Sequence, residues 1–304
     1  MPLYSVEGIV LRTREYGERD RLVTLVDRDG TRRTVLAKGV RRPRSSLAAG
    51  VQPYTYSRFL LWKGRSLDGV SQVQVLDAHA GLRGSLEALA AAAYVAELAE
   101  AFTHEGAPSP GVFPVLLAVL RGLAAAPADR VAQGLWLRYA ELRLLDLAGL
   151  GIQLEACQDC GRPLVLPGGR GAGGGPPSAP GEGAMPAGYS AEMGGALCRR
   201  CRPGRPAALS LDPATWQVLR LAGRLNPQLA ARLRPAPATL ARAAEVTQTH
   251  LVYHLGRPFR SAGILAILDE ATMLPAGEPP AAPRAAPPVQ PPAGPPAPGA
   301  SADR

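Results

Sequence analysis

The sequence predicts a mixed α+β fold, in which a small closed β-barrel precedes an α-helical domain that carries an inserted four-cysteine knuckle. Three observations predict it: short apolar runs with strand periodicity come first, Ala- and Leu-rich runs of helical period follow, and every cysteine belongs to one of two C-x-x-C pairs. The expected domains of the 304-residue chain are the barrel at 1–80, a helical domain at 81–156 and 207–272, the cysteine module at 157–206, and a disordered Pro/Ala-rich tail at 273–304.

Residues 4–78 are expected to supply five strands. The run "YSVEGIVLRTREY" leads to a turn at Gly17, and "DRLVTLVDRDG" closes on Asp29 and Gly30, a strong hairpin signal, before the return strand "TRRTVLAKG". After a loop interrupted by Pro and Gly, "YTYSRFLLWKG" and "LDGVSQVQVLDA" supply the last two strands. Five short antiparallel strands of this kind are typical of the oligonucleotide-binding (OB) barrel.

The remainder of the ordered chain is expected to be mainly helical. Ala- and Leu-rich runs that are apolar on almost every side predict helices packed in a bundle. In the third run Gly149 is a stop signal, and further on Asp212 is a cap with Pro213 at the first helical position. The expected helices cover 85–102, 111–126, 128–151, 211–223, 237–259 and 261–271.

Basic residues crowd together without acidic neighbours between Gly30 and Leu67. The whole chain has a net charge of +9 and a pI near 9.9, and this segment holds nine Arg or Lys residues but no Asp or Glu. Because like charges at such spacing repel, a polyanion is the expected partner, either nucleic acid or an anionic membrane surface. The alternative is a solvated face in an arginine-rich composition.

The loop "KGVRRPRSS" at 38–46 concentrates this charge. It is polar and rich in turn residues, so we expect it to be exposed and to bind phosphates, with counterion release supplying affinity. The predicted nucleic-acid contacts are Arg32, Arg33, Lys38, Arg41, Arg42, Arg44, Arg58 and Lys63.

Aromatic rings lie among these cations. Tyr54, Tyr56, Phe59 and Trp62 fall within nine positions, and unpaired bases stack on such rings for about 1–3 kcal/mol each. Alternation along a strand places Tyr54 and Tyr56 on one face and Phe59 on the other. Some of these rings must fill the core of so small a barrel, and the sequence leaves open which face meets solvent.

The four cysteines form the pairs "CQDC" and "CRRC". Two such turns can complete a tetrahedron of sulfur around one structural Zn²⁺, so Cys157, Cys160, Cys198 and Cys201 are the predicted ligands. Gly161 suits a turn that needs a positive φ. The 37 residues between the pairs exceed the usual spacing, but each doubling of a loop costs only about 0.6 kcal/mol. Disulfides or a redox-active pair are the alternatives.

Sequence signatures of enzymes are absent. The chain has no G-x-x-x-x-G-K-[ST], H-E-x-x-H or G-x-S-x-G motif. His250 and His254 are spaced i, i+4, but no carboxylate follows at ligand spacing, so we expect them to be structural or exposed. With neither a secretory signal nor an apolar run long enough to span a membrane, a cytoplasmic binding protein fits better than an enzyme.

Four segments together resemble the bacterial RecO family of DNA repair and recombination proteins. They are "GIVLRTREYGERDRLVTLVDRDG", "AKGVRRPRSSLAAGVQPYT", "LCRRC" and "HLGRPFRSAGIL". The resemblance covers about residues 3–270 apart from 167–188. It implies an N-terminal OB barrel, a helical domain and a zinc knuckle. The positions that match the family's basic loop are Lys38, Arg41, Arg42 and Arg44.

The resemblance also implies a function. Members of this family bind single- and double-stranded DNA, anneal complementary strands and help to load recombinase onto strands coated by single-strand-binding protein, in a RecF-type pathway. The implied partners are RecR and the acidic C-terminal tail of the coating protein, in the bacterial cytoplasm at the nucleoid. An RNA-binding or ribosome-associated protein remains an alternative, because stacking and phosphate contacts serve both polymers. So does a zinc-dependent enzyme, although four sulfur ligands leave it no open position.

Overall fold

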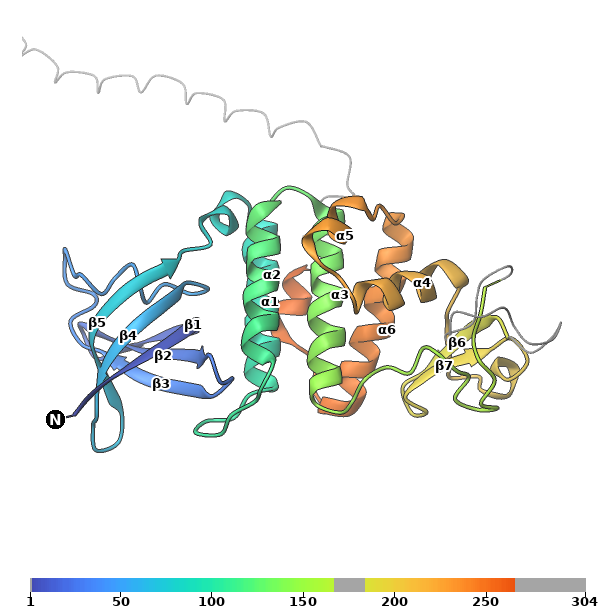
Figure 1. Cartoon of the computed structure of the whole chain (residues 1–304), viewed down its shortest axis with the longest axis horizontal. Coiled ribbons are helices and arrows are strands. Elements are labelled where there is room, and N and C mark those ends of the chain that lie inside the picture. The colour runs from blue at the N-terminus through green and yellow to red at the C-terminus, as the bar shows by residue number, and fades with distance from the viewer. Residues whose placement is uncertain (1, 167–183, 266–304) are drawn as a thin grey trace, which may run out of the picture.

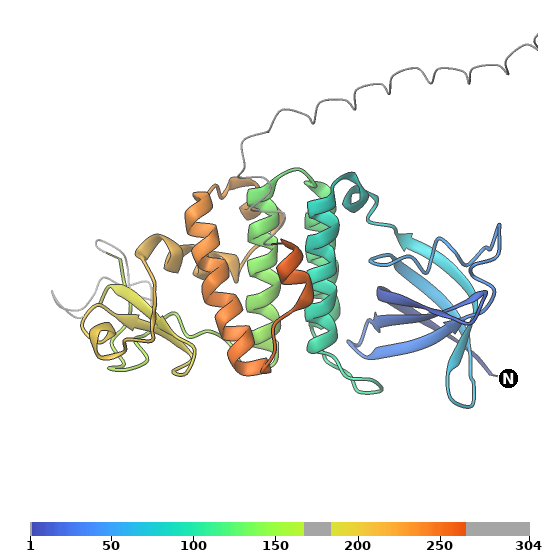
Figure 2. The same ribbon diagram turned by 180° about the vertical axis from the view of Figure 1, so that it is seen from behind.

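The protein is elongated and has three parts in a row (Figure 1). The structure, a computed structural model, describes residues 2–166 and 184–265. The barrel lies at one end, the long helices in the middle and a small sheet at the other end, an order that the reverse view also shows (Figure 2). The Gly/Pro-rich segment at 167–183 and the expected tail at 273–304 lie outside the described residues.

The N-terminal part is the expected closed barrel, with strands in the order β1-β2-β3-β5-β4. The expectation that all its strands are antiparallel is wrong at one seam, where β3 and β5 run parallel with Val35 opposite Asp68. Directions cannot alternate all the way round a ring with an odd number of strands, so one parallel pair is required. The strands are β1 (Leu3–Tyr16), β2 (Asp20–Asp27), β3 (Arg32–Ala37), β4 (Tyr56–Trp62) and β5 (Asp68–Asp77).

Two predicted turns are confirmed at the ends of β2. Gly17, between β1 and β2, has φ +63°, and Gly30, between β2 and β3, has φ +78°. An added Cβ at Gly30 would lie 1.9 Å from the carbonyl oxygen of Ser109. The hairpin therefore approaches the helical domain more closely than a residue with a side chain would allow.

The barrel core includes residues from the long loop that joins β3 to β4. Val40, Leu47 and Val51 pack with Phe59 and Leu61 among the buried side chains of the barrel. Burying side chains of this kind stabilises by about 1.5–3 kcal/mol each. The loop is thus fastened to the barrel by its apolar residues, while its basic residues remain outside.

The barrel also packs firmly against the helices. Ile9 and Val26 point away from the barrel interior and belong to the hydrophobic core of the helical domain. The Tyr56 ring meets Phe113 edge to face, with 5.4 Å between centroids, and Arg12 pairs with Glu100 at 2.8 Å. These contacts fix the orientation of the barrel relative to the bundle.

The central part is the expected helical bundle, with one addition, and the last expected helix, 261–271, lies within the described residues only as far as residue 265. The structure contains a short helix, Pro227–Arg232, that the sequence did not indicate, since six residues are too few to show a helical period. Ser85, Asp129 and Asp212 cap their helices by accepting a backbone hydrogen bond. The helices are α1 (Leu86–Ala101), α2 (Val112–Ala125), α3 (Arg130–Leu147), α4 (Pro213–Ala222), α5 (Pro227–Arg232) and α6 (Pro237–Leu255).

A small sheet carries the second pair of cysteines. Its strands run in the order β7-β6-β8 and are too short to have been predicted from periodicity: β6 (Pro186–Ser190), β7 (Gly195–Cys198) and β8 (Leu209–Ser210). None of the helices that the structure describes is long and apolar enough to cross a membrane.

Candidate nucleic-acid interface and metal centre

The basic loop is held in place by backbone hydrogen bonds as well as by its buried valine and leucine residues. The Gly39 N–H donates to Asp20 Oδ1 at 2.7 Å, and the Arg41 N–H donates to the carbonyl oxygen of Arg19 at 3.0 Å. Both acceptors belong to the region of the β1–β2 turn, so that turn lies directly beside the loop. The loop therefore presents its side chains from a fixed backbone.

The four basic residues of this loop, Lys38, Arg41, Arg42 and Arg44, are exposed, as the sequence predicted. Arg41 reaches Glu15 at 3.1 Å, but Glu15 is 62% exposed, and such surface pairs contribute at most about 1 kcal/mol. Lys38, Arg42 and Arg44 form no ion pair with any residue that the structure describes. This cluster of like charges is thus largely uncompensated by the protein itself.

Arg44 has a backbone conformation that is uncommon for a residue with a side chain. Its φ is +63°, in the left-handed region, where a strained residue costs about 1–3 kcal/mol. Glycine would adopt the same conformation without that cost. The loop thus carries a basic side chain at a position where glycine would fit the backbone with less strain.

The other four predicted contacts have acceptors within the protein. Arg33 pairs with the buried carboxylate of Asp27 at 2.7 Å. Arg32 donates to the Glu100 carbonyl oxygen at 2.8 Å and so links the barrel to α1. The remaining pairs are Arg58 with Glu7 at 2.7 Å and Lys63 with Asp68 at 3.2 Å.

These carboxylates come from outside the acid-free segment. Because Glu7 is on β1, Asp27 on β2 and Asp68 on β5, only the strand pairing brings them to the cations. The Tyr56 hydroxyl and Arg58 both donate to Glu7 and hold the pKa of its carboxyl below the ordinary value. The eight predicted contacts therefore fall into an uncompensated group on the loop and a second group with structural partners.

The aromatic residues of the same region differ in their exposure. Phe59 is fully buried in the barrel core, and Tyr56 faces the helices, so these two do lie on opposite faces of β4. Tyr54 precedes the strand, in a turn with φ +67°, but it packs against the same helical core as Tyr56, so the two rings do lie on one side. The Tyr54 carbonyl oxygen accepts a hydrogen bond from His79 Nδ1 at 2.7 Å. Trp62 is partly buried like Tyr54 and Tyr56, but unlike them it does not pack against the core of the helical domain.

Three further exposed cations were not among the predicted contacts, although Arg65 is one of the nine basic residues of the acid-free segment. Arg14 and Arg19 are exposed in the region of the β1–β2 turn, and Arg65 is exposed between β4 and β5. In OB barrels these two connections are the ones that contact oligonucleotides. The predicted turn at Gly17 was the available signal, but the acidic residues Glu15 and Glu18 obscured the charge of that segment.

The four cysteines meet at one point, as predicted. Their Sγ atoms all lie within 4.8 Å of one another, and those of Cys160 and Cys198 are 3.9 Å apart. A tetrahedron with Zn–S bonds of about 2.3 Å separates its sulfurs by about 3.8 Å. The donor set and its spacing therefore fit one metal ion. No other such cluster of ligands occurs among the described residues.

The local backbone shapes the turn around these thiols and places N–H groups that favour the thiolate form of Cys157. Gly161 has φ +72°, as its place after the first pair predicted, and its N–H donates to the Cys157 carbonyl oxygen at 2.8 Å. Burial by itself raises the pKa of Cys157, but the N–H groups of Cys160, Cys198 and Asp159 outweigh it and lower this pKa to about 7. The Asp159 carboxylate raises the pKa of Cys201, and a bound cation would displace that thiol proton.

An ion pair and shared packing join the cysteine module to the rest of the molecule. Arg205 reaches Asp159 at 2.8 Å and so ties the chain after the second pair to the first. Cys157 and Cys198 are buried in the same hydrophobic core as Trp216 of α4, whose indole N–H donates to the Leu154 carbonyl oxygen at 2.8 Å. A metal ion at this centre would hold the module against the helices.

The two histidines do not form a metal site. His250 is buried, its Nε2 donates to the Leu150 carbonyl oxygen at 2.7 Å, and its Nδ1 therefore accepts from the Tyr189 hydroxyl at 2.6 Å. Burial lowers the pKa of His250, which keeps the ring neutral. His254 is exposed on the same helix. The structural and exposed roles expected from the sequence are both present.

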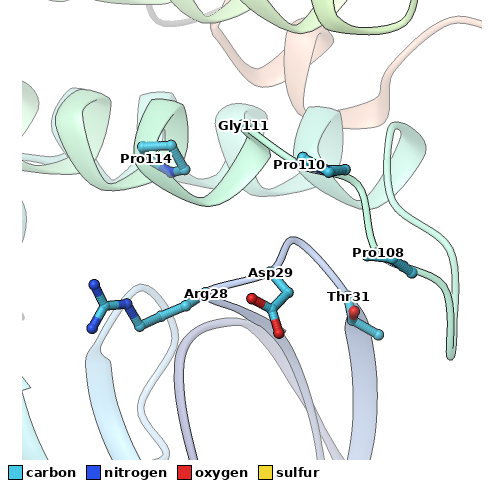
Figure 3. Close-up of a pocket in the computed structure, with 7 residues that line it drawn as sticks. All are labelled: Arg28, Asp29, Thr31, Pro108, Pro110, Gly111 and Pro114. Carbon is cyan, nitrogen blue, oxygen red and sulfur yellow. The ribbon is translucent and has the colours of Figure 1, made fainter.

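A cleft separates the β2–β3 hairpin from the start of α2 (Figure 3). Arg28, Asp29 and Thr31 line one side of it, and the other side comes from the segment that leads into α2: Pro108, Pro110, Gly111 and Pro114. The guanidinium group of Arg28 already pairs with Glu7 at 3.4 Å. The cleft combines proline rings with few free polar groups, so it lacks the convergent donors and acceptors of a ligand site.

Comparison with known proteins identifies the same family over most of the chain. Residues 1–79 match the family described as Recombination protein O N terminal, and residues 83–262 match Recombination protein O C terminal. A protein named DNA repair protein RecO from Desulforudis audaxviator is 39% identical over 268 residues, covering 87% of this chain and 97% of the relative. One of the same name from Pelotomaculum thermopropionicum is 37% identical, covering 91% and 98%.

Proposed function

The chain belongs to the RecO family of DNA repair proteins, and from this premise we propose that it binds single- and double-stranded DNA and anneals complementary strands. The observation that carries the proposal is the exposed, uncompensated cluster of Lys38, Arg42 and Arg44 on a fixed loop. Phosphates neutralise such a cluster and release their counterions when they bind. Arg41, whose surface partner Glu15 is solvated, joins the same interface.

Annealing of this kind needs no enzymatic step. Base pairing between complementary strands is itself downhill, and the main obstacle at close approach is repulsion between the two phosphate backbones. Cations on the barrel reduce that repulsion along one strand and leave its bases free to pair. The mechanism is therefore electrostatic, and it weakens as salt screens the charges.

The metal centre has a supporting role in this proposal. One Zn²⁺ held by Cys157, Cys160, Cys198 and Cys201 would have four sulfur ligands and no open position for water. Such an ion stabilises the fold of the module and does not take part in catalysis. We accordingly propose that the protein acts as a binding protein and not as an enzyme.

The wider role follows from the family. We propose that the protein helps to load recombinase onto strands coated by single-strand-binding protein, in a RecF-type pathway of bacterial DNA repair. Its protein partners are then RecR and the acidic C-terminal tail of the coating protein. The site of action is the bacterial cytoplasm at the nucleoid. The basic pI of the chain supports an acidic partner.

An annealing assay tests the proposal directly. Two complementary oligonucleotides, one carrying a fluorophore and the other a quencher, are mixed with the protein, with and without prior coating by single-strand-binding protein. The wild type should accelerate pairing in both conditions. Arg41→Ala/Arg42→Ala should slow pairing by about tenfold at moderate salt, because two cations that bind phosphates are removed.

The matched control removes two arginines from the far end of the molecule. Arg199 and Arg200 are exposed in the cysteine module, so Arg199→Ala/Arg200→Ala makes the same change in net charge. This variant should anneal at nearly the wild-type rate. Equal reductions in the two variants would show that net charge alone matters, and the assignment to the loop would fail. Stronger binding of RNA than of DNA of the same sequence would favour an RNA-binding function instead.

A further inference from the structure

Trp62 differs from the other two tryptophans in its surroundings. Trp136 and Trp216 are 4% and 2% exposed, inside the helical domain. Trp62 is only partly buried at the last position of β4, on the outer surface of the barrel. Tryptophan is enriched at interfaces, where one part of the ring is apolar and the N–H reaches a polar partner.

The barrel surface beneath Trp62 is shaped for a flat ring. Trp62 lies opposite Gly69 on β5, and a Cβ added at Gly69 would be 2.1 Å from atoms of the indole. Any side chain at Gly69 would therefore push the ring away from the sheet. Leu36 on β3 and Leu3 on β1 continue the same row across the neighbouring strands, which gives the indole an apolar surround.

Lys38 of the basic loop also contacts this ring. Its Nζ atom lies 5.3 Å from the centroid of the Trp62 ring, and the side chain forms no ion pair with the described residues. An exposed cation–π contact contributes about 0.5–1 kcal/mol, whereas a stacked base contributes about 1–3 kcal/mol. A base can thus displace the ammonium group, which then binds a phosphate of the same strand.

We propose that Trp62 is a stacking site for one unpaired nucleobase and that it makes the barrel prefer single strands to duplex. This inference rests on the proposed function, because the loop cations must first hold the strand. In a duplex the bases are already stacked and paired, so none is available to the indole. Phosphate contacts alone would not distinguish the two forms in this way.

The fluorescence of Trp62 provides the test. Oligo(dT), which forms no duplex of its own, is titrated into the full-length protein while tryptophan emission and binding anisotropy are followed together. Because the other two tryptophans are buried away from the barrel, a change in emission should report on Trp62. Oligo(dT) should quench the emission, a DNA duplex should not, and the quenching should disappear in Trp62→Phe.

Affinity measurements on variants complete the test. Trp62→Ala should weaken binding of oligo(dT) by about 5- to 100-fold, as expected when one base no longer has a ring to stack on, and change duplex binding by less than about twofold. Trp62→Phe, which keeps a ring, should retain intermediate affinity and shows that the site tolerates substitution. Tyr253→Ala removes a ring that is 55% exposed on α6 and should change neither affinity.

Three results would overturn the inference. If oligo(dT) binds without quenching and Trp62→Ala binds it normally, Trp62 does not stack, although the proposed function stands. If Trp62→Ala weakens single-strand and duplex binding equally, the ring only supports the loop. If the wild type binds no single strand at all, the proposed function fails together with the inference.

Discussion

The barrel, which carries the basic loop, and the four-cysteine module lie at opposite ends of the molecule (Figure 1) and differ in how their functional residues are brought together. In the module two short turns each bring their own pair of ligands, and the four sulfurs meet within 4.8 Å. At the barrel the charges are spread over strands and loops, and some of them pair with carboxylates from other strands. A short motif such as C-x-x-C positions its own ligands. For a run of basic residues, the fold decides which cations pair with carboxylates and which stay free to bind a partner.

Removal of Cys198, a proposed metal ligand, should have the largest effect and should separate the two regions. Cys198→Ser replaces a buried ligand and should lower the free energy of unfolding of the module by more than about 3 kcal/mol, since structural metal binding is coupled to folding. Metal content and thermal denaturation measure this change. Affinity of the barrel for oligo(dT) should remain within about twofold. A parallel fall in affinity would show that the two regions do not act separately.

The second prediction concerns Arg33, which has a structural partner in Asp27, in contrast to the cations of the loop. Asp27 accepts from Arg33 at 2.7 Å and from the Thr31 N–H at 2.9 Å, so Asp27→Asn should destabilise the protein by about 1–3 kcal/mol. Urea denaturation measures the change. Asp29→Asn, at the exposed neighbouring position, is the control and should have little effect. Unchanged stability in Asp27→Asn would mean that Arg33 is not held as we describe.

Replacement of Arg44 by glycine should raise the stability of the protein and weaken its binding of DNA. Because the φ of Arg44 is +63°, Arg44→Gly should relieve strain and raise the free energy of unfolding by about 0.5–1 kcal/mol. The same change removes a cation from the loop and should weaken DNA binding. Urea denaturation and binding anisotropy, measured on one preparation, give both values. A variant that is less stable and binds normally would remove Arg44 from the interface.

The smallest expected effect is a dependence of stability on pH within the helical domain. Burial lowers the pKa of His250 from its ordinary value of 6.5, so the unfolded chain takes up the proton first as the pH falls. The stability that neutral His250 provides is complete above pH 6.5 and is lost below it. Replacement by glutamine, His250→Gln, should make the fall in stability between pH 7 and 5 less steep, although His79, with a pKa also lowered by burial, keeps part of it. An unchanged slope in denaturation curves would contradict this.

The sequence predicted local features more successfully than long-range ones. The turns at Gly17 and Gly30, the cap at Asp212 and the cysteine cluster depend on neighbouring residues and are confirmed. The partners of Arg33 and Arg58 depend on strand pairing, and no property of residues 30–67 alone reveals them. The fit of Trp62 on Gly69 depends in addition on a register shift in β4 and β5 between Leu60 and Leu61.

The salt dependence of oligo(dT) binding tests the central claim most directly. Affinity is measured for the wild type, for Arg42→Ala/Arg44→Ala and for the charge-matched control Arg199→Ala/Arg200→Ala. We predict that the loop variant lowers the slope of log affinity against log salt by about 0.7 for each phosphate that it no longer neutralises, while the control keeps the wild-type slope. Identical slopes in all three proteins would contradict the assignment of the basic loop as the nucleic-acid interface.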